Sequence, residues 1–208
     1  DMASYNLSNS SKSIKKLSND KTYVVKVDQG IKGRFKKGLV VLDKKSKDLL
    51  GVVLDLEKKG FSSFFIEEHI NHQSSLELYI SIERVREGKK TLYSKSGGVG
   101  IEKNKASVHQ IILSTNKDIQ KVSEYLGIDK SFLENILDAF DKYHFSFLEI
   151  NPLVLANGKL YLLDLAVEVD STAEFFVNGQ WSSEDFVLVK PKTKEENEIL
   201  KLSAKSQA

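Results

Sequence analysis

The sequence predicts an α+β fold with mixed, largely antiparallel sheets and flanking helices. Short apolar segments with β periodicity outnumber the helical segments, and several are joined by turns too short for a parallel crossover. The dipeptide Asn157-Gly158 lies between two such segments. Asn-Gly is the strongest short-range signal for a β-hairpin, because both central residues of the turn need positive φ. These observations favour a sheet built from hairpins.

The elements follow in chain order from periodicity and turn residues. Residues 1–21 are rich in Ser, Asn and Lys without a sustained period, so we expect a flexible lead-in. Glu87-Gly88 is expected to be the turn of a second hairpin. Strands are expected at 22–27, 38–43, 61–70, 76–85, 89–96 and 109–115, and glycine loops at 28–38 and 96–102.

Three helices are predicted between or after these strands. The first covers 46–59 and ends with Gly60 as its C′ residue. The second covers 116–127. The third covers 131–144, where Ser131 and Glu134 have the spacing of a capping box. The charged residues 190–208 are expected to form an exposed tail or helix, or a linker to a further domain.

The Asn157-Gly158 turn also predicts the register of its hairpin. It pairs Leu155 with Leu160, Leu153 with Leu162, and Asn151 with Asp164, and directly opposite side chains share one face. The other face is expected to be the core side. Its members are Leu148, Ile150, Val154, Tyr161, Leu163, Leu165 and Val167. Pro152 cannot donate to the ladder and marks where regular pairing stops.

Beyond the leucines, the first face carries acceptor-rich side chains, including Glu149 and Glu168 as well as Asn151 and Asp164. An amide oxygen beside a carboxylate offers the hard ligands that Mg²⁺ takes when it shares phosphate oxygens with a substrate. One interpretation is therefore a Mg-nucleotide site. The alternative is a hairpin with one face in water, which is common in antiparallel sheets.

Composition bounds the class of protein. Lys and Arg number 31 and Asp and Glu 29, so the net charge of +2 gives no global electrostatic case for nucleic acid or an anionic membrane. Cysteine is absent, which excludes disulfides and thiolate chemistry. No apolar run approaches the roughly 20 residues of a membrane span. We expect a soluble, cytoplasmic protein of one large domain or two joined lobes, in which the start at Asp1 indicates a processed chain or a piece of a longer one.

Other residues have the chemistry to bind a nucleotide. Lys26 alternates out of an apolar strand just before a glycine loop and could reach a phosphate; the alternative is a lysine on an exposed face. The loop 28–38 carries Gly30, Gly33 and Gly38 among the cations Lys32, Arg34, Lys36 and Lys37 and could cradle an anion, although it lacks the ending of a Walker A loop. An RNA-contacting loop is a further alternative, but Phe35 is its one aromatic residue. Glu77 could accept ribose hydroxyls, and the backbone from Glu68 to Ile70 could meet an adenine edge.

The four histidines, at 69, 72, 109 and 144, invite a metal interpretation, but His69 and His72 lack helical i, i+4 spacing. We therefore do not favour a zinc site. No serine nucleophile elbow is present.

Four segments, in this order, closely resemble the ATP-grasp portion of ATP-citrate lyase and its relatives, the small subunit of two-subunit citrate lyases and the β subunits of citryl-CoA and succinyl-CoA synthetases. They are YVVKVDQGIKGRFKKGLV, FFIEEHINHQSSLELYISIERVREG, SGGVGIE and FSFLEINPLVLANGKLYLLDLAVEVDSTAEF. The likeness covers about residues 22–176, and LEINPL with LDLA is its most specific part.

The resemblance implies an ATP-grasp fold that holds ATP between two sheets, with a first lobe at 22–75 and a second at 76–189. Lys26 matches the phosphate-contacting lysine and Arg34 a nucleotide-contacting arginine. The backbone at Glu68 and Ile70 falls on the adenine side, and Glu77 on the ribose-side glutamate. The resemblance places the Mg²⁺ ligands at Asn151 and Asp164.

It also implies that the reaction needs partners. In this family phosphate passes from ATP to a histidine on another domain, then to citrate, and is exchanged for CoA. None of the four histidines matches that residue, so no catalytic residue is expected in this chain. We expect an α-type subunit or domain that carries the phosphohistidine, CoA and citrate sites, in a hetero-oligomer without nucleic acid or membrane.

Three departures from the family keep alternatives open. Phe35 stands where citrate lyases favour glycine, Ser96 replaces an acid of an EGG loop, and the lead-in stands where the family has an opening helical segment. The alternatives are a succinyl-CoA synthetase β-like subunit and a non-catalytic ATP-grasp paralogue.

Overall fold

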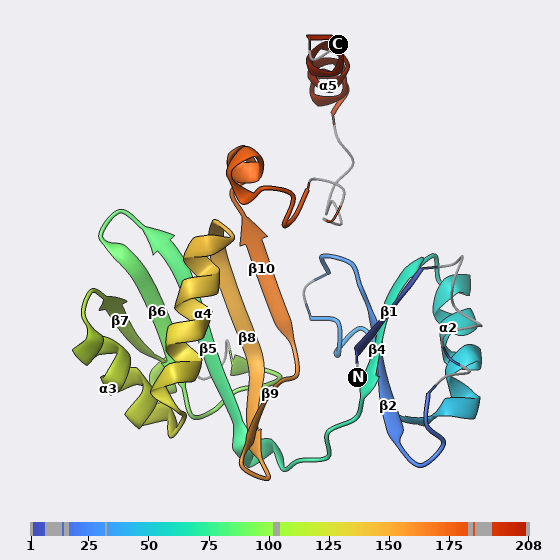
Figure 1. Cartoon of the computed structure of the whole chain (residues 1–208). Helices are drawn as coiled ribbons and strands as arrows, with labels where there is room; N and C mark the ends of the chain where they lie inside the picture. The colour runs from blue at the N-terminus through green and yellow to red at the C-terminus, as the bar shows by residue number, and fades with distance from the viewer. Residues whose placement is uncertain are drawn as a thin grey trace. The chain divides into compact units, whose positions relative to one another are not determined.

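The computed structural model describes residues 2–6, 14, 17–31, 33–101, 105–182, 185 and 193–206 (Figure 1). The chain divides into two compact units, which we call unit 1 (residues 1–70 and 186–208) and unit 2 (residues 71–185). The division falls between residues 70 and 71, five residues before the boundary that the sequence predicted. Each unit has its own sheet and its own apolar core.

Unit 1 is a four-stranded antiparallel sheet in the order β1-β4-β2-β3, with one helix on it. Val25, Val27, Phe64 and Ile66 point from the sheet into the core, where Leu49, Val53 and Leu56 of the helix meet them. The elements are β1 (Met2–Asn6), β2 (Thr22–Val27), β3 (Val40–Lys45), a 3-10 turn η1 (Ser46–Asp48), α2 (Leu49–Lys58) and β4 (Ser63–Glu68). The charged C-terminal segment is helical as α5 (Lys194–Ser206).

The expectation of a flexible lead-in is wrong for Met2–Asn6. This segment is β1, and it pairs antiparallel with β4 from Met2 opposite Glu67 to Asn6 opposite Ser63. The side of β4 away from β2 would otherwise present unpaired N–H and C=O groups, which another strand satisfies through backbone bonds. Such pairing needs little hydrophobic periodicity, so the sequence pattern did not reveal it.

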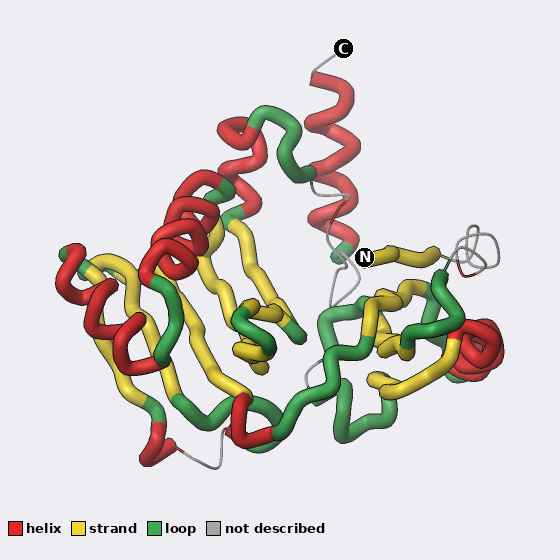
Figure 2. Tube along the Cα trace, turned by 60° about the horizontal axis from the view of Figure 1, so that its bottom comes forward, coloured by secondary structure: helices red, strands yellow, loops and turns green. Residues whose placement is uncertain are grey.

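Unit 2 is a six-stranded antiparallel sheet with α3 and α4 along one face (Figures 1 and 2). Its strand order is β10-β8-β5-β6-β7, and β9 pairs with the far end of β8. The elements are η2 (Ser74–Leu76), β5 (Glu77–Val85), β6 (Gly88–Ser94), η4 (Lys105–Ser107), β7 (His109–Leu113), α3 (Asn116–Leu126), α4 (Lys130–Lys142), β8 (Phe145–Ala156), β9 (Lys159–Leu162), β10 (Leu165–Val169) and η5 (Ser171–Val177). Leu133, Leu137 and Phe140 of α4 pack with Ile82 and Ile150 in the core. The α+β prediction is confirmed.

Two local predictions were wrong by small shifts. Val85 pairs with Gly88, so the β5–β6 turn is Arg86-Glu87, and Gly88 is the first residue of β6, with φ of +134°. The glycine signal therefore marks a strand end and not the turn itself. Helix α4 begins one residue early because the Asp129 carboxylate caps it, accepting bonds from the Ser131 N–H and hydroxyl, both at 2.7 Å. A capping box does occur, in α3, between Thr115 and Asp118.

The strict alternation expected along the acceptor hairpin fails at one point. Leu78 pairs with Leu153 but Ile80 pairs with Ile150, so β8 has an extra residue at Asn151 and Pro152, whose peptide bond is cis. A bulge of this kind resets which side chains face the core. Leu153, expected beside Asn151, is consequently 0% exposed in the core. Pro152 marks the interruption, as predicted.

Leu165 was also expected in the core and is 48% exposed. It opens β10, which is an edge strand of the sheet. An edge position leaves one side of the residue without a neighbouring strand, so period-2 alternation alone overestimates its burial.

Candidate functional site

Asn151 and Asp164 lie opposite each other, as the turn predicted. The β8–β9 ladder keeps the pairs Leu155 with Leu160 and Leu153 with Leu162. The Asn151 N–H then donates to the Asp164 carbonyl oxygen at 3.0 Å, and beyond this point Ile150 pairs with Leu165 of β10. The two residues thus sit where β8 passes from one partner strand to the next. The backbone register therefore places Asn151 opposite Asp164.

The Asn151 side chain is held by the glycine loop after β6. Its Oδ1 accepts the N–H of Gly98 at 2.6 Å, and its Nδ2 donates to the Gly98 carbonyl at 3.5 Å. Gly98 has a φ of +77°. The sequence identified the loop as glycine-rich but could not reveal this contact, because the two residues are 53 positions apart.

Glu77 begins β5 beside the same loop. Its backbone carbonyl accepts the Gly97 N–H at 2.8 Å, and its Oε1 lies 3.1 Å from His72 Nε2. A Cβ at Gly98 would lie 1.7 Å from Glu77 Oε2, and one at Gly97 would lie 2.4 Å from the Leu78 carbonyl oxygen. Gly97 is therefore required by close packing against the β5 backbone, whereas a Cβ at Gly98 would push aside the end of the Glu77 side chain. Glu77, Gly98 and Asn151 form one cluster. Glu102, at the end of the predicted loop, lies outside the described residues.

Sequence reasoning missed a second polar group on β5 and β8. The Tyr79 hydroxyl lies 3.1 Å from Ser81 Oγ and 3.3 Å from Glu149 Oε2. Tyr79 and Ser81 alternate with the core residues Leu78, Ile80 and Ile82, so they occupy the sheet face opposite α3 and α4. Burial raises the pKa of Tyr79, and the nearby Glu149 carboxylate raises it further, whereas the hydrogen bond between Tyr79 and Ser81 opposes the increase. Tyr79 and Ser81 are both buried. The hydrogen bond from the buried Tyr79 hydroxyl positions the half-buried Glu149.

In unit 1, Lys26 is largely buried and paired. Its ammonium contacts Glu67, and only 12% of its side chain is exposed. Tyr23, Val25 and Val27 face the core, as the alternation predicted, and Lys26 lies on the other face of β2. This environment excludes the alternative of an exposed lysine. The partner, Glu67, was not foreseen because it lies 41 residues away on β4.

The glycine loop after β2 turns back on its own strand. Arg34 Nη1 donates to the Val27 carbonyl at 2.8 Å, and Ser63 Oγ lies 3.5 Å from Asp28 Oδ2. Burial raises the pKa of Asp28, against the opposing effects of the Arg34 charge and the Ser63 bond. Phe35 is 51% exposed. Lys32, which the sequence counted among the loop cations, lies outside the described residues.

Glu68 and Ile70 occupy the end of β4 and the residues after it. Glu68 pairs with Tyr23 in the ladder, and its carboxylate bonds Lys21 at 2.5 Å. Ile70 is half-buried. Nothing in these contacts tests the predicted adenine role of this backbone.

The four histidines lie apart from a common centre. His69 Nδ1 is 3.6 Å from Asp43, and His72 is next to Glu77. His109 stacks on Tyr93 and meets Tyr125 edge-to-face, and the ring of His144 lies 6.1 Å from that of Phe176. Among the residues that the structure describes, no three His, Asp or Glu side chains gather as a metal site would require.

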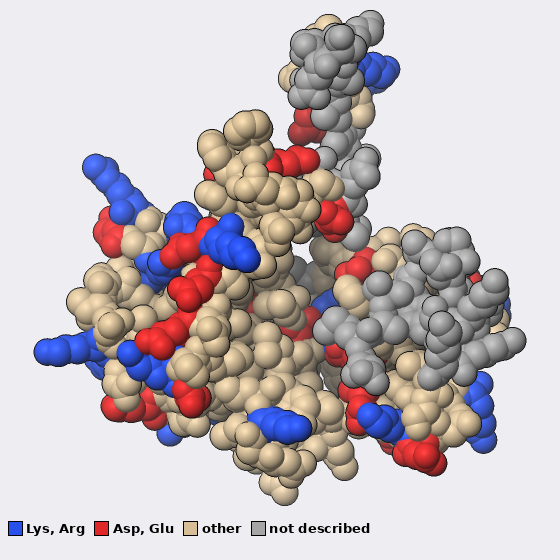
Figure 3. Space-filling view, in the orientation of Figure 1, with Lys and Arg blue, Asp and Glu red and all other residues tan. Residues whose placement is uncertain are grey.

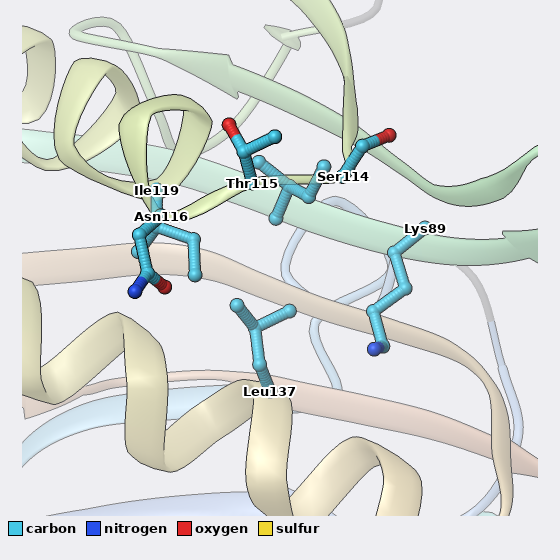
Figure 4. A pocket seen from close by; sticks show the side chains of 7 residues that line it. Lys89, Ser114, Thr115, Asn116, Ile119 and Leu137 are labelled. Atoms are coloured by element: carbon cyan, nitrogen blue, oxygen red, sulfur yellow. The ribbon is translucent and has the colours of Figure 1, made fainter.

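A cavity of about 170 Å³ opens elsewhere in unit 2, and it does not include any residue predicted to bind nucleotide (Figure 4). Its lining is Lys89, Leu113, Ser114, Thr115, Asn116, Ile119 and Leu137. Lys89 is held by Asp141 at 2.7 Å. Acidic and basic side chains are interleaved on the surface around α4 (Figure 3), as the pairs Arg84 with Asp141 and Lys130 with Glu134 illustrate. Over the described residues, no helix is long and apolar enough to cross a membrane.

Two antiparallel sheets on separate units, a glycine loop after β2, and a hairpin that pairs Asn151 with Asp164 are features of an ATP-grasp protein. The fold agrees with the solved structure of ATP citrate lyase from Methanothrix soehngenii in complex with citrate and coenzyme A. The TM-score is 0.75 at 22% identity, and the match covers 98% of this chain and 53% of that one. A dinucleotide-forming acetyl-coenzyme A synthetase 1 from Ca. Korarchaeum cryptofilum shares the fold at a TM-score of 0.53 and 12% identity, over 71% of this chain and 76% of that one.

Residues 2–181 match the family described as the ATP-citrate synthase ATP-grasp domain, and the chain belongs to this family. The match begins at residue 2, so it includes the segment that we had left outside the resemblance. ATP-citrate synthase of Mus musculus is 33% identical, with 78% of this chain and 17% of that protein covered. An ATP-citrate synthase subunit alpha chain from Oryza sativa subsp. japonica is 32% identical, with 79% and 45% covered. The chain thus spans less than half the length of these relatives.

Proposed function

We propose that this chain binds Mg-ATP as the ATP-grasp part of an ATP-citrate synthase and supplies the nucleotide half of citryl-CoA formation. The observation that carries the proposal is the backbone bond from Asn151 to Asp164, which brings a residue with an amide oxygen opposite a residue with a carboxylate, between β9 and β10. This donor set fits Mg²⁺, which takes hard oxygen ligands and keeps several waters. When bound, the metal would neutralise charge on the phosphates.

The other site residues divide between the two units. Lys26 and Arg34 of unit 1 offer positive charge to phosphate oxygens, and the backbone at Glu68 and Ile70 meets the adenine. Glu77 of unit 2 accepts hydrogen bonds from ribose hydroxyls. Positioning and charge stabilisation of this kind are most of what phosphoryl transfer requires from a protein.

The rest of the reaction belongs to partner domains or subunits. The proposed acceptor of the phosphoryl group is a histidine outside this chain, followed by citrate and CoA. Two solved structures support this arrangement: the archaeal lyase was solved with citrate and coenzyme A, and the acetyl-coenzyme A synthetase with coenzyme A, Mg-AMPPCP and a phosphohistidine segment pointing towards its nucleotide site.

Calorimetric titration with ATP, with and without Mg²⁺, tests the proposal. The parent chain should bind ATP more tightly when Mg²⁺ is present, and Asn151→Ala and Asp164→Ala should each remove that gain because each deletes one ligand oxygen. Asp138→Ala, an exposed change on α4, is the control and should bind as the parent does. A folded Asp164→Ala protein with unchanged Mg-dependent binding would contradict the assignment.

A further inference from the structure

Gly98 contacts two of the three residues that unit 2 offers to Mg-ATP, Asn151 and Glu77. Its N–H donates to Asn151 Oδ1 at 2.6 Å and its carbonyl accepts from Asn151 Nδ2 at 3.5 Å. Its α-carbon faces Glu77, because a Cβ there would lie 1.7 Å from Glu77 Oε2. One residue of the loop after β6 therefore lies between the proposed metal ligand and the proposed ribose ligand.

The N–H and carbonyl groups of Gly98 determine the orientation of the Asn151 side-chain amide. A side-chain amide has a donor end and an acceptor end, and Gly98 offers a complementary acceptor and donor. Rotating the amide by 180° would place two donors together and two acceptors together. The amide oxygen has two lone pairs, so the bond from Gly98 leaves one for a metal ion.

We propose that Gly98 is a positioning residue for Mg-ATP, which orients the Asn151 amide oxygen towards Mg²⁺ and leaves the Glu77 carboxylate its space. This inference rests on the proposed function. It assigns the first two glycines after Ser96 different roles: Gly97 packs against the backbone of β5, and Gly98 acts on two ligand side chains. Partners that orient a metal ligand commonly change metal affinity about 10- to 100-fold when they are altered.

The chain contains a matched control for this residue. Gly98 and Gly100 both have positive φ, +77° and +97°, so alanine introduces left-handed backbone strain at either position. A Cβ at Gly100 would meet nothing within 4 Å, whereas a Cβ at Gly98 would collide with Glu77. A difference between the two alanine variants therefore reports the contacts of Gly98 and not the strain.

The experiment measures ATP binding by calorimetry over a series of Mg²⁺ concentrations for Gly98→Ala and Gly100→Ala. We expect Gly98→Ala to raise the half-saturating Mg²⁺ concentration about tenfold or more. Gly100→Ala should stay close to the parent. Equal shifts in the two variants would overturn the inference.

Two further comparisons, made in Asn151→Ala and Glu77→Ala proteins, test whether Gly98→Ala acts through these two side chains. In Asn151→Ala protein, the additional Gly98→Ala change should not alter the remaining Mg²⁺ dependence; an effect of undiminished size there would show a general structural role and overturn the inference. Should Gly98→Ala fail to fold, the Glu77→Ala/Gly98→Ala protein lacks the collision and is compared with Glu77→Ala alone. Equal Mg²⁺ dependence of these two supports steric displacement through Glu77, and a persistent tenfold difference contradicts it.

The outcomes separate this inference from the proposed function. A parent chain whose ATP binding does not depend on Mg²⁺ would overturn both. A parent whose Mg²⁺ dependence is lost in Asn151→Ala but kept in Gly98→Ala would uphold the function and overturn the positioning role alone.

Discussion

At the scale of single residues, the site is built from polar groups whose partners lie far away in sequence. Lys26 meets Glu67, and Asn151 meets Gly98. Local reasoning predicted that Lys26 lies off the core face of its strand and that Asn151 lies opposite Asp164, because strand alternation and turn register are local properties. It could not predict their partners, which depend on how strands and loops distant in sequence come together.

Thr91 shows the opposite case, a buried polar group without a hydrogen bond. Its hydroxyl lies at 0% exposure in β6, and within the described residues it has no hydrogen-bond partner. An unsatisfied buried hydroxyl costs about 1–3 kcal/mol, and valine has nearly the same shape. Thr91→Val should therefore raise the free energy of unfolding by about 1 kcal/mol, measured by urea denaturation.

Thr91→Ser is the matched control for that prediction. It keeps the hydroxyl and removes a buried methyl group, so it should lower the free energy of unfolding by about 1 kcal/mol. A Thr91→Val protein less stable than the parent would show that the hydroxyl is satisfied.

At the scale of elements, turn and cap chemistry determines where strands and helices end. Asn157-Gly158 predicted the hairpin register because a two-residue turn leaves one pairing available, and that register carries through β9 to β10. The bulge at Asn151 was not predictable in its effect on Leu153, because it depends on pairing with β5, a strand distant in sequence. Asp129 caps α4 in place of the predicted Ser131, because the Asp129 carboxylate accepts the free N–H of Ser131.

Alanine substitutions at two exposed glycines should change the free energy of unfolding in opposite directions. Gly51 is inside α2, where alanine is favoured, and Gly127 caps α3 in the left-handed region at φ 71° and ψ 32°. A Cβ would meet nothing within 4 Å at either position. Gly51→Ala should raise the free energy of unfolding by about 0.5–1 kcal/mol. Gly127→Ala should lower it by about 1 kcal/mol because L-residues avoid this conformation.

Denaturant titration of both glycine variants measures these changes in one experiment. A stabilising Gly127→Ala substitution would contradict the left-handed cap, and a destabilising Gly51→Ala substitution would contradict the helical environment assigned to that residue.

At the scale of the whole molecule, the residues proposed to contact Mg-ATP belong to two units with separate cores. Lys26 and Arg34 belong to unit 1, whereas Glu77, Asn151 and Asp164 belong to unit 2. The fold class followed from periodicity and hairpin signals, but β1 did not, because its pairing to β4 is a backbone interaction without an apolar pattern. The proposed function requires contacts with Mg-ATP at the residues assigned in each unit.

Amide hydrogen exchange with and without Mg-ATP tests that requirement most directly. Mg-ATP should slow exchange in the loop 28–38 and at residues 68–70 of unit 1, and also around Glu77, Gly98 and Asn151 of unit 2. Slower exchange is expected because the ligand contacts these segments and reduces their local opening. Protection in both units is the result that we predict. Protection confined to one unit, or none at saturating Mg-ATP, would contradict the account.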